Sequence, residues 1–264
     1  MIRLGVLDFD TSHVTAFTQR LHHVGVDREQ WVEGARIVVG CPGESVLSPE
    51  RIAGFTAEMR KYEVPLVDRP TDMIGRVDAV LIESVDGTVH LARARPFLER
   101  GIPCFVDKPF TCSAADARTL IDLAARHKTF VFSSSSLRYA PEVVQYVGDA
   151  AKGKLLGCAV HCPAPLSPIP ARNAGLYHYG IHGAEILYTL MGPGCFHTVR
   201  GPPAGHAAGS VGAAQVPSPR GPRHAGQSAA SADRGRRRTA RAARLMSAPP
   251  PPPRGSRRSC SPPR

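Results

Sequence analysis

The chain has 264 residues, 42% of them hydrophobic, which is enough for one large domain or two ordinary domains with buried cores. Its net charge of +11 is confined to the C-terminal part: 13 arginines and one acidic residue lie from Arg200 onward, which leaves 20 basic and 21 acidic residues in the first 199. The main body of the chain therefore has no basic excess that would indicate nucleic-acid binding.

Seven scattered cysteines, an odd number, are typical of reduced thiols. No signal peptide is visible and no apolar run is long enough to cross a membrane, so we expect a cytoplasmic protein without a membrane partner.

Strands and helices alternate through the first half of the chain. Strands are predicted at residues 3–7, 35–40, 65–67, 77–82, 102–106 and 129–132, and helices or helical turns at 14–21, 49–62, 71–75, 90–100 and 113–126. This alternation predicts an α/β fold with a doubly wound parallel Rossmann sheet.

The loop after the first strand stands where such sheets hold a pyrophosphate, at the N-terminus of the following helix. A glycine-rich sequence is expected there, but Asp8, Asp10 and His13 occupy the glycine positions. Two carboxylates would repel a phosphate, and Asp10, Thr11 or Ser12 is more simply a helix N-cap. The second strand ends in Cys41, where an NAD site usually has an acidic residue for the ribose hydroxyls, and Glu44 is only a possible substitute.

The strand at 102–106 ends in Asp107-Lys108-Pro109. Ligands of open α/β sheets bind at the carboxyl ends of the strands, and a lysine held there can exchange protons with a substrate hydroxyl. A solvated loop lysine is the alternative.

The pattern changes after residue 141. A helix is predicted at 141–151, a strand of a new sheet at 155–161 and a helix at 175–192. His178 and His182, four residues apart, should share one helix face with Glu185 nearby. They could bind a metal, line a substrate pocket as proton donors, or simply pack in the core.

Four motifs in chain order resemble the Gfo/Idh/MocA family of NAD(P)-dependent oxidoreductases, the group of glucose–fructose oxidoreductase and inositol dehydrogenase. Asp107-Lys108-Pro109 matches the E-K-P of that family, and residues 178–192 match its D-I-G-x-H helix. Residues 84–90 and Leu137-Arg138-Tyr139 echo two further motifs, so that the resemblance covers residues 1–199.

The resemblance implies hydride transfer between NAD or NADP and a sugar or polyol hydroxyl. Lys108 would position and polarise that hydroxyl, His182 would accept its proton, and His178 would replace the family's usual aspartate. No metal is implied. The implied cofactor-binding residues are Asp8, Asp10, Thr11, Ser12, His13, Cys41, Ser84, Val85, His90, Asp107, Lys108 and Arg138.

We expect three regions: a dinucleotide-binding Rossmann domain (1–136), an incomplete α+β substrate domain (137–199) and a disordered Arg/Pro-rich tail (200–264). The tail has no aromatic residue and one leucine, so it cannot bury enough apolar surface to fold. Its composition is typical of a GC-rich gene read out of frame, which indicates a frameshift near residue 200.

A second hypothesis is an inactive relative that keeps only the Rossmann core. In a third, the basic tail binds nucleic acid non-specifically. Family-like homo-oligomers are not expected because the second domain is incomplete.

Overall fold

The computed structural model describes residues 1–153, 155–194, 198–200 and 211–213. Five parallel strands form one sheet in the order β2-β1-β3-β4-β5. The strands are β1 (Ile2–Leu7), β2 (Ala35–Cys41), β3 (Ala79–Ile82), β4 (Cys104–Val106) and β5 (Val131–Phe132). The helices of this sheet region are α1 (His13–His22), α2 (Pro49–Lys61), α3 (His90–Leu98) and α4 (Ala114–Arg126).

The strand predicted at residues 65–67 is reduced to a single parallel bridge between Gly40 and Leu66. This bridge consists of two hydrogen bonds, Gly40 N to Pro65 O and Val67 N to Gly40 O, both 2.9 Å, and Pro65 has no N–H with which to extend the ladder. With this segment counted as a third strand, the order becomes 3-2-1-4-5-6, the order of dinucleotide-binding Rossmann sheets. The prediction of a doubly wound parallel sheet is confirmed.

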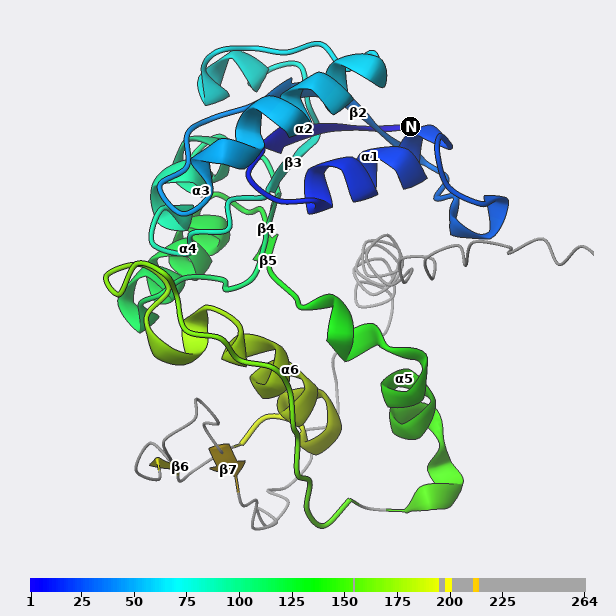
Figure 1. The fold of residues 1–264 in the computed structure, drawn as a ribbon, viewed down its shortest axis with the longest axis vertical. Coiled ribbons are helices and arrows are strands. Elements are labelled where there is room, and N and C mark those ends of the chain that lie inside the picture. The colour runs from blue at the N-terminus through cyan, green and yellow to red at the C-terminus, as the bar shows by residue number, and fades with distance from the viewer. Residues whose placement is uncertain (154, 195–197, 201–210, 214–264) are drawn as a thin grey trace, which may run out of the picture.

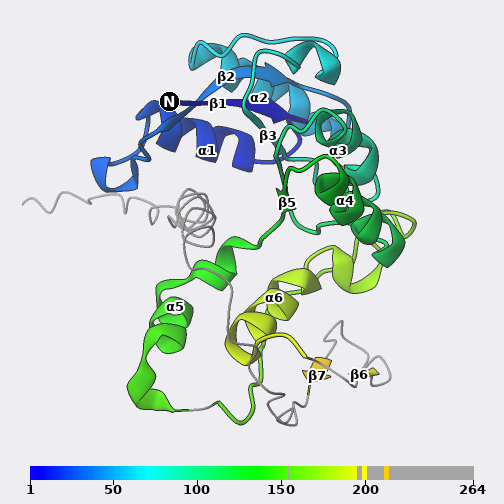
Figure 2. The same cartoon turned by 180° about the vertical axis from the view of Figure 1, so that it is seen from behind.

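Both faces of the sheet are covered by helices, so alternate residues of each strand enter different cores. Helices α1 and α2 cover a core that includes Val6, Ile37 and Met59, and α3 and α4 cover one that includes Leu7 and Val80. Figures 1 and 2 show α1 and α2 on one side of the strands and α3 and α4 on the other. The helices change sides between β1 and β3, which makes the carboxyl ends of these neighbouring strands the topological switch point.

The C-terminal segment contains α5 (Pro141–Gly148) and α6 (Gly180–Met191), which lie below the sheet in Figure 1. The strand predicted at residues 155–161 is wrong: these residues form no strand, because a strand needs a partner and none of the described residues pairs with them. The described strands of this segment are β6 (Thr198–Arg200) and β7 (Val211–Ala213), which pair antiparallel.

Of the predicted disordered tail, only Arg200 and residues 211–213 are described; residues 201–210 and 214–264 lie outside the described part of the chain. Among the described helices, none combines the length and the apolar character needed to cross a membrane.

Candidate active site

Asp8 follows β1 directly and adopts a left-handed backbone conformation, with φ of +65°. Its carboxylate accepts hydrogen bonds from Ser84 Oγ and, at 3.0 Å, from Arg93 Nε, and it is almost fully buried. Burial raises the pKa of Asp8 to about 6, against the opposing effects of Arg93 and Ser84. Gly43 packs so tightly on this carboxylate that a Cβ there would collide with it.

Asp10 also points into the protein. Its Oδ1 accepts a 3.0 Å hydrogen bond from the amide of Val85 in the loop after β3. The two carboxylates expected to repel a phosphate are therefore engaged by the neighbouring loop, and Asp8 is in addition paired with an arginine.

The N-terminus of α1 lacks a side-chain cap. Ser12 occupies the N-cap position without a capping hydrogen bond, and no acidic residue lies in the first turn. The expectation of a side-chain N-cap is thus wrong for Ser12, because its backbone is already helical and its side chain does not reach the N2 or N3 amide. Thr11 Oγ1 makes only a long, 3.4 Å contact with the amide of His13. The helix terminus keeps N–H donors for an anion.

Two predicted cofactor residues face the interior instead. Cys41 is fully buried at the end of β2, and its thiol donates to Asp68 O, so it presents nothing to a ribose. His90 is fully buried at the start of α3, with Nε2 2.8 Å from Ser84 O and Nδ1 2.9 Å from Pro109 O. Its ring connects the loops after β3 and β4 and has no nitrogen left for a ligand.

Lys108 lies next to the two predicted catalytic histidines. It follows β4 with a cis peptide bond to Pro109, and its Nζ lies 5.2 Å from the ring centre of Tyr179. Burial and the nearby Lys108 charge lower the pKa of His178, and they lower that of His182 to about 4. Both imidazoles should therefore be neutral at pH 7, and a second cation beside Lys108 does not arise.

The shared helix face predicted for the two histidines is wrong. His178 precedes α6, which begins at Gly180, because the chain first makes a short 3₁₀ turn at Gly175–Tyr177. Its Nδ1 is buried without a hydrogen-bond partner among the described residues. His182 lies in the first turn of α6 and is held by Ser135, whose Oγ is 2.6 Å from His182 Nδ1.

Ser135 joins the sheet region to α6. It follows β5, its amide donates to Glu185 Oε2 at 2.7 Å, and its side chain is fully buried. Arg138 lies 3.5 Å from the same Glu185 oxygen, so this predicted cofactor residue is directed to α6. Nothing in the sequence singled out Ser135 from the four consecutive serines at 133–136.

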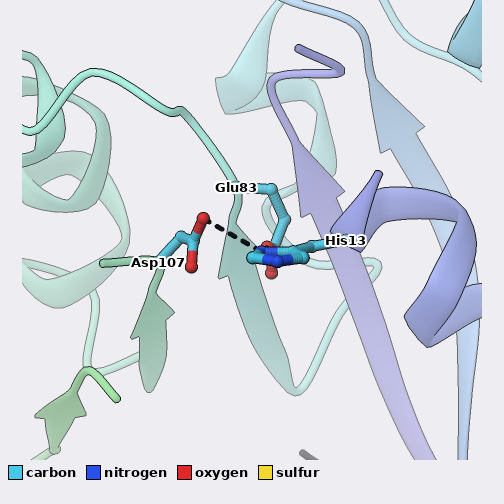
Figure 3. A group of neighbouring side chains, drawn as sticks. All are labelled: His13, Glu83 and Asp107. Atoms are coloured by element: carbon cyan, nitrogen blue, oxygen red, sulfur yellow. Dashed lines mark hydrogen bonds and ion pairs between the residues drawn. The ribbon is translucent and has the colours of Figure 1, made fainter. Parts of the chain in front are cut away.

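Asp107 and His13 come together at the ends of β4 and the first loop, as Figure 3 shows. His13 Nδ1 lies 3.0 Å from Asp107 Oδ2 and 3.8 Å from Oε2 of Glu83, the residue after β3. Burial raises the pKa of Glu83 well above its usual range, and Asp107 and Asp10 add to the effect. Sequence reasoning missed Glu83, whose only signal is its place after a buried strand.

The loop after β3 is fixed by residues far along the chain. Asn173 is buried, accepts from the amide of Gly87 at 2.8 Å and donates to Val85 O at 2.6 Å. Arg172 donates to Asp86 Oδ2 at 2.7 Å. These contacts order one wall of the site, and nothing in the proline-rich segment predicted them.

Residues 46–135 match the family model described as "Oxidoreductase family, NAD-binding Rossmann fold" of the Gfo/Idh/MocA group. This stretch of the sheet region is therefore similar to the NAD-binding domain of Gfo/Idh/MocA oxidoreductases. UDP-N-acetylglucosamine 3-dehydrogenase of Acidithiobacillus ferrooxidans is 28% identical over 143 residues, which are 54% of this chain and 44% of that protein. Rhizopine catabolism protein MocA of Rhizobium meliloti is 35% identical over 131 residues, 46% of this chain and 41% of that protein.

The chain thus spans less than half of the length of these two relatives. A crystal structure of the A. ferrooxidans dehydrogenase superposes with a TM-score of 0.57 at 20% identity, covering 78% of this chain and 59% of the other. At that identity the superposition supports the fold alone. The superposed part includes some of the C-terminal segment, because it covers 78% of the chain and the sheet region makes up only about half of it.

Proposed function

We propose that this chain is an NADP-dependent oxidoreductase that acts on a hydroxyl of a sugar or polyol. The observation that carries the proposal is the arrangement of Lys108 and the neutral His182 beside the switch point of a Gfo/Idh/MocA sheet. One relative is a UDP-N-acetylglucosamine 3-dehydrogenase, which supports a sugar as the substrate class.

A dinucleotide fits the first loop despite the missing glycines. The uncapped N-terminus of α1 offers N–H groups to a pyrophosphate, with Thr11 and Ser12 beside it. The carboxylates of Asp8 and Asp10 are turned toward Ser84 and Val85, which leaves the backbone side of the loop for the ligand. A bound nicotinamide dinucleotide supplies the hydride acceptor or donor.

His182 is the residue that accepts the proton of the substrate hydroxyl in this proposal. When Nδ1–H donates to Ser135 Oγ, Nε2 keeps the lone pair that accepts a proton. The pKa of about 4 means that this nitrogen is unprotonated at neutral pH. Lys108 orients the hydroxyl and favours the developing negative charge on its oxygen, and the proton can leave His182 to solvent because the residue is only partly buried.

The end of β2 favours NADP over NAD. The buried Cys41 offers no carboxylate to ribose hydroxyls. Arg51 from α2 instead reaches this edge and donates to Asp10 O at 3.2 Å. An arginine beside the adenosine ribose is the usual partner of the 2′-phosphate.

Titration calorimetry of the full chain with NAD⁺, NADH, NADP⁺ and NADPH tests the proposal. We expect saturable binding, with the NADP forms tighter by about tenfold or more, the value of one charge-assisted hydrogen bond. Arg51→Ala should remove that preference, whereas Arg60→Ala, an exposed arginine on the same helix, should keep it. Binding of none of the four nucleotides would refute the oxidoreductase proposal and favour a relic of the Rossmann core.

Catalysis is tested by Lys108→Ala and His182→Gln against a panel of polyols and nucleotide sugars, with nucleotide binding as the control for folding. Both variants should bind the dinucleotide and lose turnover.

We further propose that residues 1–136 form the dinucleotide-binding domain and residues 137–199 part of the substrate domain. The free thiols of the five described cysteines support a cytoplasmic location.

A further inference from the structure

Three side chains from separate elements converge where β3 and β4 end. His13 opens α1, Glu83 follows β3 and Asp107 follows β4. One nitrogen or oxygen from each lies within 4.8 Å of the others, with His13 Nδ1 at 3.0 Å from Asp107 Oδ2 and 3.8 Å from Glu83 Oε2 (Figure 3). The ladder bonds Glu83 N to Leu7 O and Asp107 N to Ile82 O, 2.9 and 2.8 Å long, set the register that brings the two carboxylates together.

Glu83 is the unusual member of this group. Its side chain has no exposed surface, and neither carboxylate oxygen has a hydrogen-bond partner among the described residues. Lys108 and Asp10 are the other charged groups near it, but no ion pair within 4.0 Å joins Glu83 to Lys108 in the described part of the chain. A buried carboxylate without partners is costly unless it holds a proton or binds a cation.

The spacing of the three donors is close to that of ligands on one metal ion. With metal–ligand distances of about 2.1 Å, neighbouring donors stand about 3.0 Å apart in octahedral and about 3.5 Å apart in tetrahedral geometry. Asp107 is held in place because its other oxygen accepts from the amide of Lys108 at 2.8 Å. The His13 side chain is 37% exposed, which provides a route for entry from solvent.

We propose that His13, Glu83 and Asp107 form a binding site for a first-row divalent cation that accepts imidazole and carboxylate ligands, such as Mn²⁺. Two carboxylates and one neutral imidazole balance the charge of the ion, and the remaining positions would be filled by water. The site lies on the same edge of the sheet as the dinucleotide loop, but it does not depend on the proposed oxidoreductase activity.

Mn²⁺ is the appropriate probe because the chain has seven cysteines, which would compete for Zn²⁺. The full chain is titrated with Mn²⁺ in the absence of nucleotide, and free Mn²⁺ is measured by its electron paramagnetic resonance signal. We expect saturation at one ion per chain. Glu83→Gln and His13→Gln should each weaken binding by at least about tenfold, since each removes one ligand. Asp122→Asn, which removes an exposed carboxylate from α4, should leave binding unchanged.

Glu83→Gln also separates this proposal from the alternative in which Glu83 simply holds a proton, because glutamine has the shape of the protonated acid. The proposal is overturned if the folded chain shows no saturable Mn²⁺ binding, or if Glu83→Gln and His13→Gln bind it as the wild type does. Circular dichroism establishes that each variant is folded. His13→Gln, at a partly exposed position, decides the question if Glu83→Gln does not fold.

Discussion

Replacing Asp8 by asparagine should stabilise this protein at neutral and alkaline pH. Asp8 is buried, and burial raises its pKa from 3.8 to about 6 even though Arg93 pairs with it. Asparagine has the shape of the protonated acid and tolerates the left-handed backbone conformation that Asp8 adopts. The substitution therefore removes the burial cost of the charge and preserves the packing.

The expected size of the effect follows from the two pKa values. A raised pKa in the folded state means that the ionised carboxylate destabilises the fold. With values of 3.8 and about 6, this cost is roughly 3 kcal/mol. It is present in full above pH 6 and vanishes below pH 3.8. Asp8→Asn should thus be more stable than the wild type by roughly 3 kcal/mol at pH 8, and the difference should disappear as the pH approaches 4.

Urea unfolding followed by circular dichroism at several pH values between 4 and 8 measures this difference. Asp78→Asn is the control of opposite sign, because its hydrogen bonds to Arg3 lower the pKa of the exposed Asp78 to about 2. The stability that Asp78 contributes is present at pH 8 and is lost only as the pH falls toward 2, so Asp78→Asn should not stabilise. A pH-independent difference for Asp8→Asn, or a loss of stability at pH 8, would refute the reasoning.

Three further predictions concern the contacts between the sheet region and the C-terminal segment. Lys108→Met removes an ammonium that, together with burial, lowers the pKa of His182, so the ring-proton NMR signal of His182 should titrate at a higher pH; an unchanged midpoint would contradict this. Ser135→Ala deletes a buried hydroxyl that bonds this imidazole and should lower the free energy of unfolding by about 1–2 kcal/mol, measured in urea, while a change near zero would count against the bond. Asn173→Ala leaves the amide of Gly87 without its hydrogen-bond acceptor, so it should lower the free energy of unfolding by about 2–3 kcal/mol and speed proteolytic cleavage of the loop after β3. Cleavage at the wild-type rate would argue against a role of Asn173 in ordering this loop.

The parallel sheet could be predicted because its signals are local. Buried strands such as residues 77–82 are continuous apolar runs, and each is followed by turn residues and an amphipathic helix. The prediction of a strand at residues 155–161 was wrong because its apolar pattern is similar to that of the buried strands, but the described residues contain no partner strand for it. A strand is stabilised by pairing, which no local pattern contains.

The sequence by itself determined the parallel sheet and the position of Lys108 at a strand end, and only the family resemblance implied that His182 lies near it. Only the tertiary structure decided which polar groups are paired: Asp8 with Arg93, which is 85 residues away in the chain, and His13 with Asp107, which is 94 residues away. It also decided that Cys41 and His90 face the interior and that Glu83 lies beside His13 without a hydrogen-bond partner among the described residues. The physical reason is that the charge state of a side chain depends on burial and on neighbours brought together by the sheet, and spacing along the chain specifies neither.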